Sequence, residues 1–175
     1  MFHFISTTQL TRQALFELIN RAHELKLAKE TPPQFHKTII NLFYEPSTRT
    51  FCSFHAAAIK LSCSVINLNP KDSSMEKGES FEDTIKTLGY YGDVIVLRHP
   101  NNEALQKAAL ISKIPIINAG NGNDQHPTQA LLDVFTIYTE LHSFGIDMES
   151  TERETITITF LGDLKNSRTI HSLLH

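Results

Sequence analysis

A run of hydroxyl and guanidinium side chains occupies Pro46–Thr50 (PSTRT) and has the chemistry of a phosphate site. Three hydroxyl groups and one arginine, whose planar fork of N–H donors suits a phosphate, lie in four consecutive positions: Ser47, Thr48, Arg49 and Thr50. The run follows an apolar stretch, Ile39–Phe43, and opens a helical pattern, so free backbone N–H groups would face the same anion. An ordinary helix cap with a solvated arginine explains the same four residues, and the run alone does not separate these interpretations.

Two other positions carry groups that could bind an anion or a carbonyl oxygen. Arg98 directly follows an apolar run, Val94–Leu97, and places a second guanidinium at the end of a predicted strand. His126 precedes Pro127, which suits the first position of a helix, and Gln129 follows within that helix. An imidazole there could polarise a carbonyl oxygen, and a glutamine could hydrogen-bond an amide. Taken singly, each is explained more simply as a helix cap or a surface arginine.

The positions of these groups in the predicted fold favour the functional interpretation. Each follows a predicted strand or the loop after it, and the three strands end near Phe43, Leu97 and Ala119. The carboxyl ends of parallel strands meet at one edge of a sheet, where ligands of such folds bind. We therefore expect one shared site at that edge.

The loop Asn69–Glu79 is polar, long for a strand-to-helix connection, and contains Gly78. Lys77 in this loop could reach over a bound phosphate. A solvated loop lysine between two glutamates is the simpler interpretation from spacing alone.

The elements that would position these groups alternate along the chain. Apolar spacing predicts a long amphipathic helix over Leu10–Leu25. Short, β-branched apolar runs predict buried strands at Ile39–Phe43, Val65–Leu68, Val94–Leu97 and Ile114–Ile117. Helical spacing between and after them predicts helices at Thr50–Leu61, Phe81–Tyr91, Glu103–Ile111 and Pro127–His142. This alternation predicts an α/β fold, a doubly wound parallel sheet flanked by helices.

The order of elements also predicts a domain boundary. Residues 1–142 form the first domain, and the polar segment 143–154, which contains Gly145, is a surface linker. Residues 155–175 then begin a second, incomplete domain, with a strand at Thr155–Leu161 and a helix at Arg168–His175. A single βα unit has nothing against which to bury its faces.

Composition excludes several classes of protein. The chain has 175 residues, 41% hydrophobic and 20% charged, with a formal net charge of −3. This balance argues against nucleic-acid binding, and no apolar run is long enough to span a membrane. The two cysteines, Cys52 and Cys63, favour a reducing cytoplasm over a disulfide framework. Neither a dinucleotide fingerprint nor the full ligand set of a metal site occurs, so no cofactor and no metal are expected.

Five motifs in order resemble the aspartate carbamoyltransferase family. They are FYEPSTRTFCSF at Phe43–Phe54, KGES at Lys77–Ser80, VLRHP at Val96–Pro100, NAGNG and HPTQALLD within Asn118–Asp133, and GDLKNSRTIHSL at Gly162–Leu173. The resemblance implies transfer of a carbamoyl group from carbamoyl phosphate to L-aspartate, in pyrimidine biosynthesis, without a cofactor. It implies that this chain holds the carbamoyl-phosphate domain and the start of the aspartate domain, and that it is inactive alone.

The resemblance also implies roles for single residues. Ser47, Thr48, Arg49 and Thr50 would hold the phosphate with the help of Arg98. The carbonyl oxygen would meet Thr50, Arg98 and His126, and Gln129 would hold the carbamoyl amino group. The catalytic groups would thus be Arg49, Thr50, Arg98 and His126.

Three more residues take roles from the same resemblance. Ser73 and Lys77 match a loop that enters the active site of a neighbouring subunit, which implies a homotrimer with shared sites. Lys77 and Arg168 would bind aspartate. Ser167 departs from the glycine that the family usually has there, and its Cβ would shift Arg168. The sequence does not distinguish a free-standing enzyme from one with a regulatory subunit or multienzyme partner.

Two alternatives remain. Ornithine carbamoyltransferases resemble the first domain, but they usually carry a lysine and an arginine where this chain has Pro46 and Phe51. A non-catalytic relative that serves as a binding or assembly module is the second alternative, although every first-domain site residue is intact.

Overall fold

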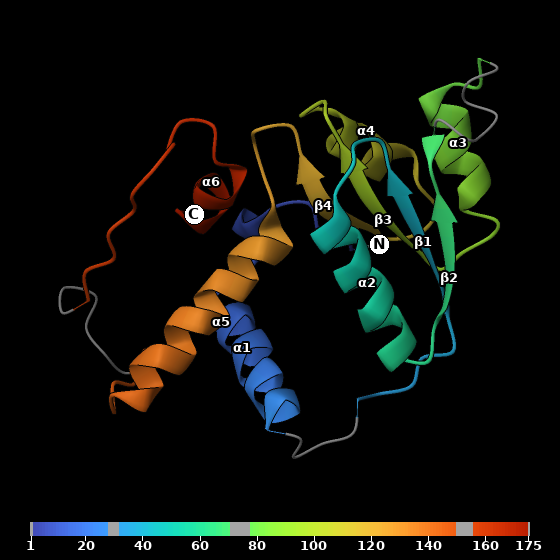
Figure 1. The fold of residues 1–175 in the computed structure, drawn as a ribbon. Coiled ribbons are helices and arrows are strands. Elements are labelled where there is room, and N and C mark those ends of the chain that lie inside the picture. Colours follow the sequence, from blue (N-terminus) through green and yellow to red (C-terminus); the bar gives the residue numbers. More distant parts are fainter. Residues whose placement is uncertain (1, 28–31, 71–77, 150–155, 175) are drawn as a thin grey trace.

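The predicted alternation of strands and helices is confirmed. A computed structural model describes residues 2–27, 32–70, 78–149 and 156–174 (Figure 1). Its strands are β1 (Thr38–Phe43), β2 (Ser64–Leu68), β3 (Val94–His99) and β4 (Ile116–Asn121). Its helices are the 3-10 turn η1 (Thr7–Gln9) and α1 (Arg12–Lys26), α2 (Thr48–Lys60), α3 (Phe81–Leu88), α4 (Ala104–Ile111), α5 (Pro127–Ser143) and α6 (Arg168–Leu173).

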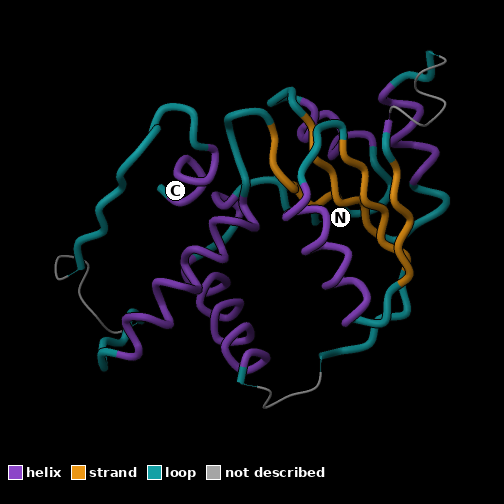
Figure 2. The backbone as a smooth tube through the Cα atoms, viewed as in Figure 1, coloured by secondary structure: helices purple, strands orange, loops and turns teal. Residues whose placement is uncertain are grey.

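The four strands, orange in Figure 2 and labelled in Figure 1, form one parallel sheet in the order β2-β1-β3-β4. The chain moves outward from β1 to β2, returns past β1 to β3, and continues outward to β4. This change of direction makes the carboxyl ends of β1 and β3 the switch point of the sheet, where a crevice forms between loops that leave to opposite faces.

Helices cover both faces of the sheet, so the doubly wound prediction is confirmed. On one face, alternate residues of the central strands pack against α3 and α4 in a cluster that includes Ile40, Leu97, Ile85 and Leu105. On the other face, Phe43 and Val96 pack with the partly buried Phe51 and Phe54 of α2. Burial on both faces explains why the central strands β1 and β3 contain continuous apolar runs. The prediction that Val65–Leu68 is a buried strand is wrong, because β2 lies at the edge of the sheet and its residues are exposed or only partly buried.

Two helices extend beyond the sheet. α1 and α5 lie side by side below it in Figure 1, and α6 lies near the start of α5. The residues before η1 run along β4, where Phe4 bridges Ile117. In the part of the chain that the structure describes, no helix is both long and apolar enough to cross a membrane.

Of the strand and the helix predicted after the linker, only the helix is observed. α6 forms where a helix was predicted, but residues 156–161 form no strand, so that part of the prediction is wrong. Thr155 lies outside the described residues. A strand needs a neighbour to accept and donate ladder hydrogen bonds, and this segment pairs with none of the four described strands.

Candidate active site

A cluster of three charged side chains lies at the carboxyl ends of β1 and β3. Oε1 of Glu45 lies 2.5 Å from Nη2 of Arg98 and 2.9 Å from Nη1 of Arg168. The same Nη1 donates to the carbonyl oxygen of Gly122 at 2.7 Å. Two guanidinium groups thus share one carboxylate oxygen, and the cluster keeps a net positive charge that can attract an anion.

Arg98 is the most deeply placed member of the cluster. It is 6% exposed, and its Nη1 donates to the carbonyl oxygen of Ala119 at 3.1 Å. Burial and the charge of Arg168 lower the pKa of the guanidinium, against the opposing effect of Glu45. Among the described residues, none accepts from the buried Nε of Arg98. An arginine in this state retains a donor for a ligand.

The turn after β4 brings the cluster close to His126. Gly120 has a φ of +109°, and a Cβ added there would lie 2.8 Å from Nη1 of Arg98. The same Cβ would lie 3.3 Å from Cδ2 of His126 and 3.5 Å from Cζ of Arg168. The absence of a side chain at Gly120 therefore lets all three groups meet around one point.

His126 is buried and uncharged at neutral pH. Burial, followed by the charges of Arg168 and Arg98, lowers its pKa to about 4. Its backbone N–H donates to Oγ of Ser172 at 2.7 Å. A neutral imidazole can donate one hydrogen bond without carrying a charge beside the two arginines.

The two ring nitrogens of His126 face hydroxyl groups from different elements. Nδ1 lies 3.5 Å from Oγ1 of Thr128, and Nε2 lies 3.4 Å from Oγ1 of Thr50. When Thr128 donates to Nδ1, the ring proton lies on Nε2, on the side of Thr50. Thr50 is in the first turn of α2, so the structure places this end of the hydroxyl run next to His126.

The start of α2 offers hydroxyl groups and backbone N–H groups to the same edge. Ser47 is the N-cap residue, but its side chain makes no capping hydrogen bond. Thr48 and Arg49 are exposed in the first turn. Ser47 and Thr48 line a hollow of about 470 Å³ with residues from the ends of β1 and β2. The helix start therefore has unused donors beside an open space.

Other predicted site residues are placed less directly. The side-chain nitrogen of Gln129 donates to Oδ1 of Asp133 at 3.2 Å, within α5. Ser73 and Lys77 lie outside the described residues. Ser167 has a φ of −84°, which any residue adopts, and its side chain caps α6 by accepting from the backbone of Ile170. In this structure, a Cβ at position 167 is compatible with an Arg168 that reaches the cluster.

Sequence reasoning missed two residues of the site. Glu45 was not considered, although a carboxylate directly between a predicted strand and the hydroxyl run was a usable signal. Ser172 fixes the backbone of His126 and also donates to Oε1 of Gln125 at 3.1 Å. Nothing in the spacing of Ser172 indicated this, because the contact joins segments 46 residues apart.

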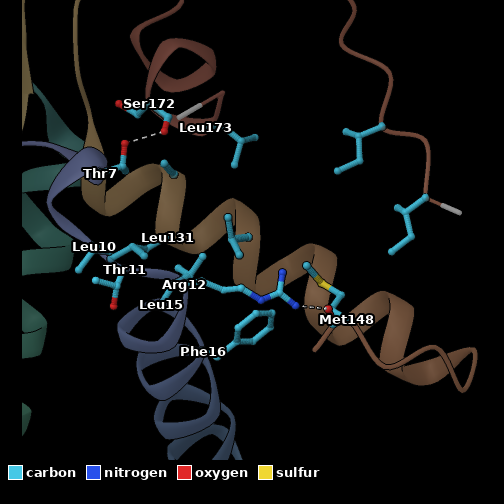
Figure 3. A pocket seen from close by; sticks show the side chains of 14 residues that line it. Thr7, Leu10, Thr11, Arg12, Leu15, Phe16, Leu131, Met148, Ser172 and Leu173 are labelled. Atoms are coloured by element: carbon cyan, nitrogen blue, oxygen red, sulfur yellow. Dashed lines mark hydrogen bonds between the residues drawn. The ribbon is translucent and has the colours of Figure 1, made fainter. Parts of the chain in front are cut away.

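A second hollow lies away from this edge. It has a volume of about 460 Å³ and is lined by residues of α1, α5 and α6 together with Met148, Ile156 and Ile158 (Figure 3). Leucines of α1, α5 and α6 line it, and Arg12 donates to the carbonyl oxygens of Met148 and Glu149 at its wall. Mostly apolar walls make it unsuited to a phosphate. In the described ranges, no three or more His, Cys, Asp or Glu side chains gather in a way that could hold a metal.

Comparisons with known proteins find relatives over nearly the whole chain. The sequence model of the family "Aspartate/ornithine carbamoyltransferase, carbamoyl-P binding domain" matches residues 3–139. The chain is 47% identical over 175 residues to Multifunctional protein ura1 of Schizosaccharomyces pombe, covering 98% of the chain and 7% of that protein. It is 44% identical over 177 residues to Multifunctional protein CAD of Squalus acanthias, covering 99% of the chain and 8% of that protein.

Solved structures resemble the fold over the same length. Aspartate transcarbamoylase from Trypanosoma cruzi, in complex with N-(phosphonacetyl)-L-aspartic acid, superposes with a TM-score of 0.87 at 43% identity. The same enzyme in complex with carbamoyl phosphate gives the same TM-score and identity. In both comparisons the match covers 98% of this chain and 52% of the solved chain. The chain thus spans about half of these structures and less than a tenth of the curated relatives.

Proposed function

The chain belongs to the aspartate/ornithine carbamoyltransferase family, as a carbamoyl-phosphate-binding domain, and from this premise we propose that it binds carbamoyl phosphate at the edge formed by β1, β3 and α2. We propose further that it contributes this site to carbamoyl transfer onto L-aspartate. The observation that carries the proposal is the buried Arg98, which keeps an unpaired Nε beside a neutral His126 and the open start of α2.

The phosphate is bound by the start of α2. The hydroxyl groups of Ser47, Thr48 and Thr50, the backbone N–H groups of the first turn and the guanidinium of Arg49 supply donors to its oxygens. Arg98 adds a charge from the opposite side of the switch point. As the bond to the carbonyl carbon breaks, negative charge grows on the phosphate, and these groups stabilise it.

The carbonyl oxygen is polarised by Thr50, Arg98 and His126. The amine of aspartate attacks the carbonyl carbon and produces a tetrahedral oxyanion. The bond from that carbon to the phosphate oxygen then breaks, and the departing phosphate accepts the proton that the amine loses. Because His126 is neutral, it acts as a hydrogen-bond donor from Nε2 and does not need to lose or gain a proton. Gln129, freed from Asp133, would hold the carbamoyl amino group.

The acceptor and the assembly lie partly beyond this chain. The solved relatives are nearly twice as long, so we propose that aspartate is bound by Arg168 together with residues of a second domain. We also propose a homotrimer in which Ser73 and Lys77 reach a neighbouring site. The relatives named multifunctional proteins support a multienzyme setting in pyrimidine biosynthesis. Both cysteines are free thiols, which suits a reducing cytoplasm.

Calorimetric titration of the intact protein with carbamoyl phosphate tests the proposal. We expect saturable binding that Arg98→Ala weakens by about a hundredfold, the loss of a buried charged donor. Arg21→Ala is the matched control, because Arg21 lies on α1, away from the site, and pairs with Glu24. Loss of binding in the control as well, or equal binding by both variants, would contradict the assignment of the site.

Transfer is measured by formation of carbamoyl-aspartate from labelled carbamoyl phosphate. Ornithine serves as the competing acceptor. We expect product with aspartate and none with ornithine. Binding of carbamoyl phosphate without transfer to either acceptor would indicate a non-catalytic relative.

A further inference from the structure

The backbone pairing between β3 and β4 is irregular at Arg98. Leu97 pairs with Asn118 and His99 pairs with Asn121, so one residue of β3 faces two residues of β4. The two residues of β4 that lie opposite Arg98 are Ala119 and Gly120. A bulge of this kind turns the local backbone and re-aims the side chains beside it. Arg98 therefore lies beside a peptide of β4 whose orientation is not determined by regular strand pairing.

A buried asparagine occupies the start of the bulge. Asn118 is fully buried, and its Oδ1 accepts from the backbone N–H of Gly120 at 2.8 Å. Its Nδ2 donates to the carbonyl oxygen of Ile5 at 2.9 Å and to Oδ1 of Asn121 at 2.8 Å. Two acceptors on one side and one N–H donor on the other fix which way the amide faces.

The peptide that Asn118 holds is the peptide that Arg98 uses. The peptide bond between Ala119 and Gly120 has one N–H donor and one carbonyl acceptor, which point in opposite directions within the plane of the peptide. Its N–H donates to Oδ1 of Asn118, and its carbonyl oxygen accepts from Nη1 of Arg98 at 3.1 Å. Because the peptide is planar, a rotation that broke one of these contacts would also move the other.

We propose that Asn118 is a positioning residue for the site: by holding the Ala119–Gly120 peptide, it keeps the carbonyl of Ala119 aimed at Arg98 and thereby aims the Arg98 guanidinium at the ligand. This inference rests on the proposed function, because the ligand that Arg98 meets is carbamoyl phosphate. Asn118 touches no ligand itself and acts through one peptide.

A matched pair of variants separates positioning from packing. Asn118→Ala and Asn118→Ser both remove the donor to Ile5 and Asn121 and leave nearly the same space. Of the two variants, only serine keeps a side-chain oxygen that can accept from the N–H of Gly120, as Oδ1 of Asn118 does. Asn41→Ala is the control, because Asn41 is also fully buried in the sheet but bonds to Asn67.

The measurement is carbamoyl phosphate affinity by calorimetry in the intact protein, with melting temperature recorded for each variant. We expect Asn118→Ala to weaken binding about tenfold and Asn118→Ser to stay within about threefold of wild type. We expect Asn41→Ala to lower the melting temperature without changing affinity. In steady-state kinetics, Asn118→Ala should raise KM for carbamoyl phosphate more than serine does, although both variants lose similar stability.

The outcomes distinguish this inference from the proposed function. Binding by wild type with equal affinity in the alanine and serine variants would overturn the positioning role and leave the function standing. Absence of binding in wild type would overturn both. If Asn118→Ala does not fold, near-normal binding by Asn118→Ser supports the inference, and a tenfold loss in that variant overturns it.

Discussion

The charges of the neighbouring arginines help to determine the protonation state of the histidine in this site. Arg98 and Arg168 converge on one oxygen of Glu45, and both lower the proton affinity of His126. Each arginine added near a buried imidazole makes its charged form less favourable, so the histidine stays a neutral donor. A bound phosphate would add the missing negative charge to this edge.

The depressed pKa of His126 predicts a pH-dependent stability. Its ordinary value is 6.5 and its folded value is about 4, so between these values the unfolded chain binds more protons than the folded one. The free energy of unfolding should therefore decrease as pH falls from 6.5 toward 4, by up to about 3 kcal/mol from this residue. Urea unfolding of wild type and His126→Gln across this window measures the difference. Parallel curves for the two proteins would contradict it.

A second prediction at this scale concerns Gly120. Gly120→Ala and Gly145→Ala both place a side chain at a positive φ, +109° and +75°, and should each cost about 1 kcal/mol of stability. A Cβ at position 120 meets Arg98 at 2.8 Å, whereas at position 145 it meets nothing within 4 Å. We expect only Gly120→Ala to weaken carbamoyl phosphate binding, by about tenfold or more. Equal affinities in calorimetric titrations of the two variants would argue against the close packing around Gly120.

At the scale of elements, the site lies where a helix and a strand depart from regular hydrogen bonding. α2 begins with an N-cap hydroxyl that caps nothing, and β4 contains a bulge beside Arg98. By contrast, α3 begins with Ser80, whose side chain accepts from the backbone of Asp83 at 3.1 Å. The hydroxyl of Ser80 stabilises its helix, whereas that of Ser47 remains for a ligand.

This contrast predicts opposite effects of one substitution at two helix starts. Ser80→Ala should lower the free energy of unfolding by about 1 kcal/mol through loss of the cap. Ser47→Ala should cost less than about 0.5 kcal/mol but weaken carbamoyl phosphate binding. Chemical denaturation and calorimetry on both variants check the two effects. A large loss of stability in Ser47→Ala would show that Ser47 is an ordinary cap.

At the scale of the whole molecule, topology places the site. The chain reverses its direction of winding between β1 and β3, so the loops after these strands diverge and leave an open edge. Arg168 reaches this edge from α6, at the far end of the described chain. Segments distant in sequence thus complete one cluster.

The proposed homotrimer, in which neighbouring subunits would share each site, predicts complementation between inactive proteins. Lys77→Ala and Arg98→Ala should each abolish activity of the intact protein, because each removes a cation from every site. Mixed in equal amounts and reassembled, they should recover up to about a quarter of wild-type activity, since a random trimer pairs an intact Arg98 with an intact neighbouring Lys77 at that frequency. Recovery no greater than the sum of the parents in an assay of carbamoyl-aspartate would contradict sharing.

Local patterns were sufficient to predict the fold class. Apolar β-branched runs predicted the presence of four strands, of which β1, β3 and β4 are mostly buried and the edge strand β2 is not. The run Ser47–Thr50 and the residues Arg98 and His126 were placed at one edge, since parallel strands end together. Oγ1 of Thr50 lies 3.4 Å from Nε2 of His126, which agrees with a shared edge.

Tertiary structure alone decided how these groups are charged and aimed. The pKa of His126 depends on its burial and on Arg168 and Arg98, which are distant in sequence. The sharing of Glu45 and the bulge opposite Arg98 depend on strand register, which sequence pattern does not specify to the residue. Residues 156–161 have strand-like alternation but form no strand, because a strand exists only with a partner. Sequence supplied the chemical groups, and long-range packing determined their electrostatics and orientation.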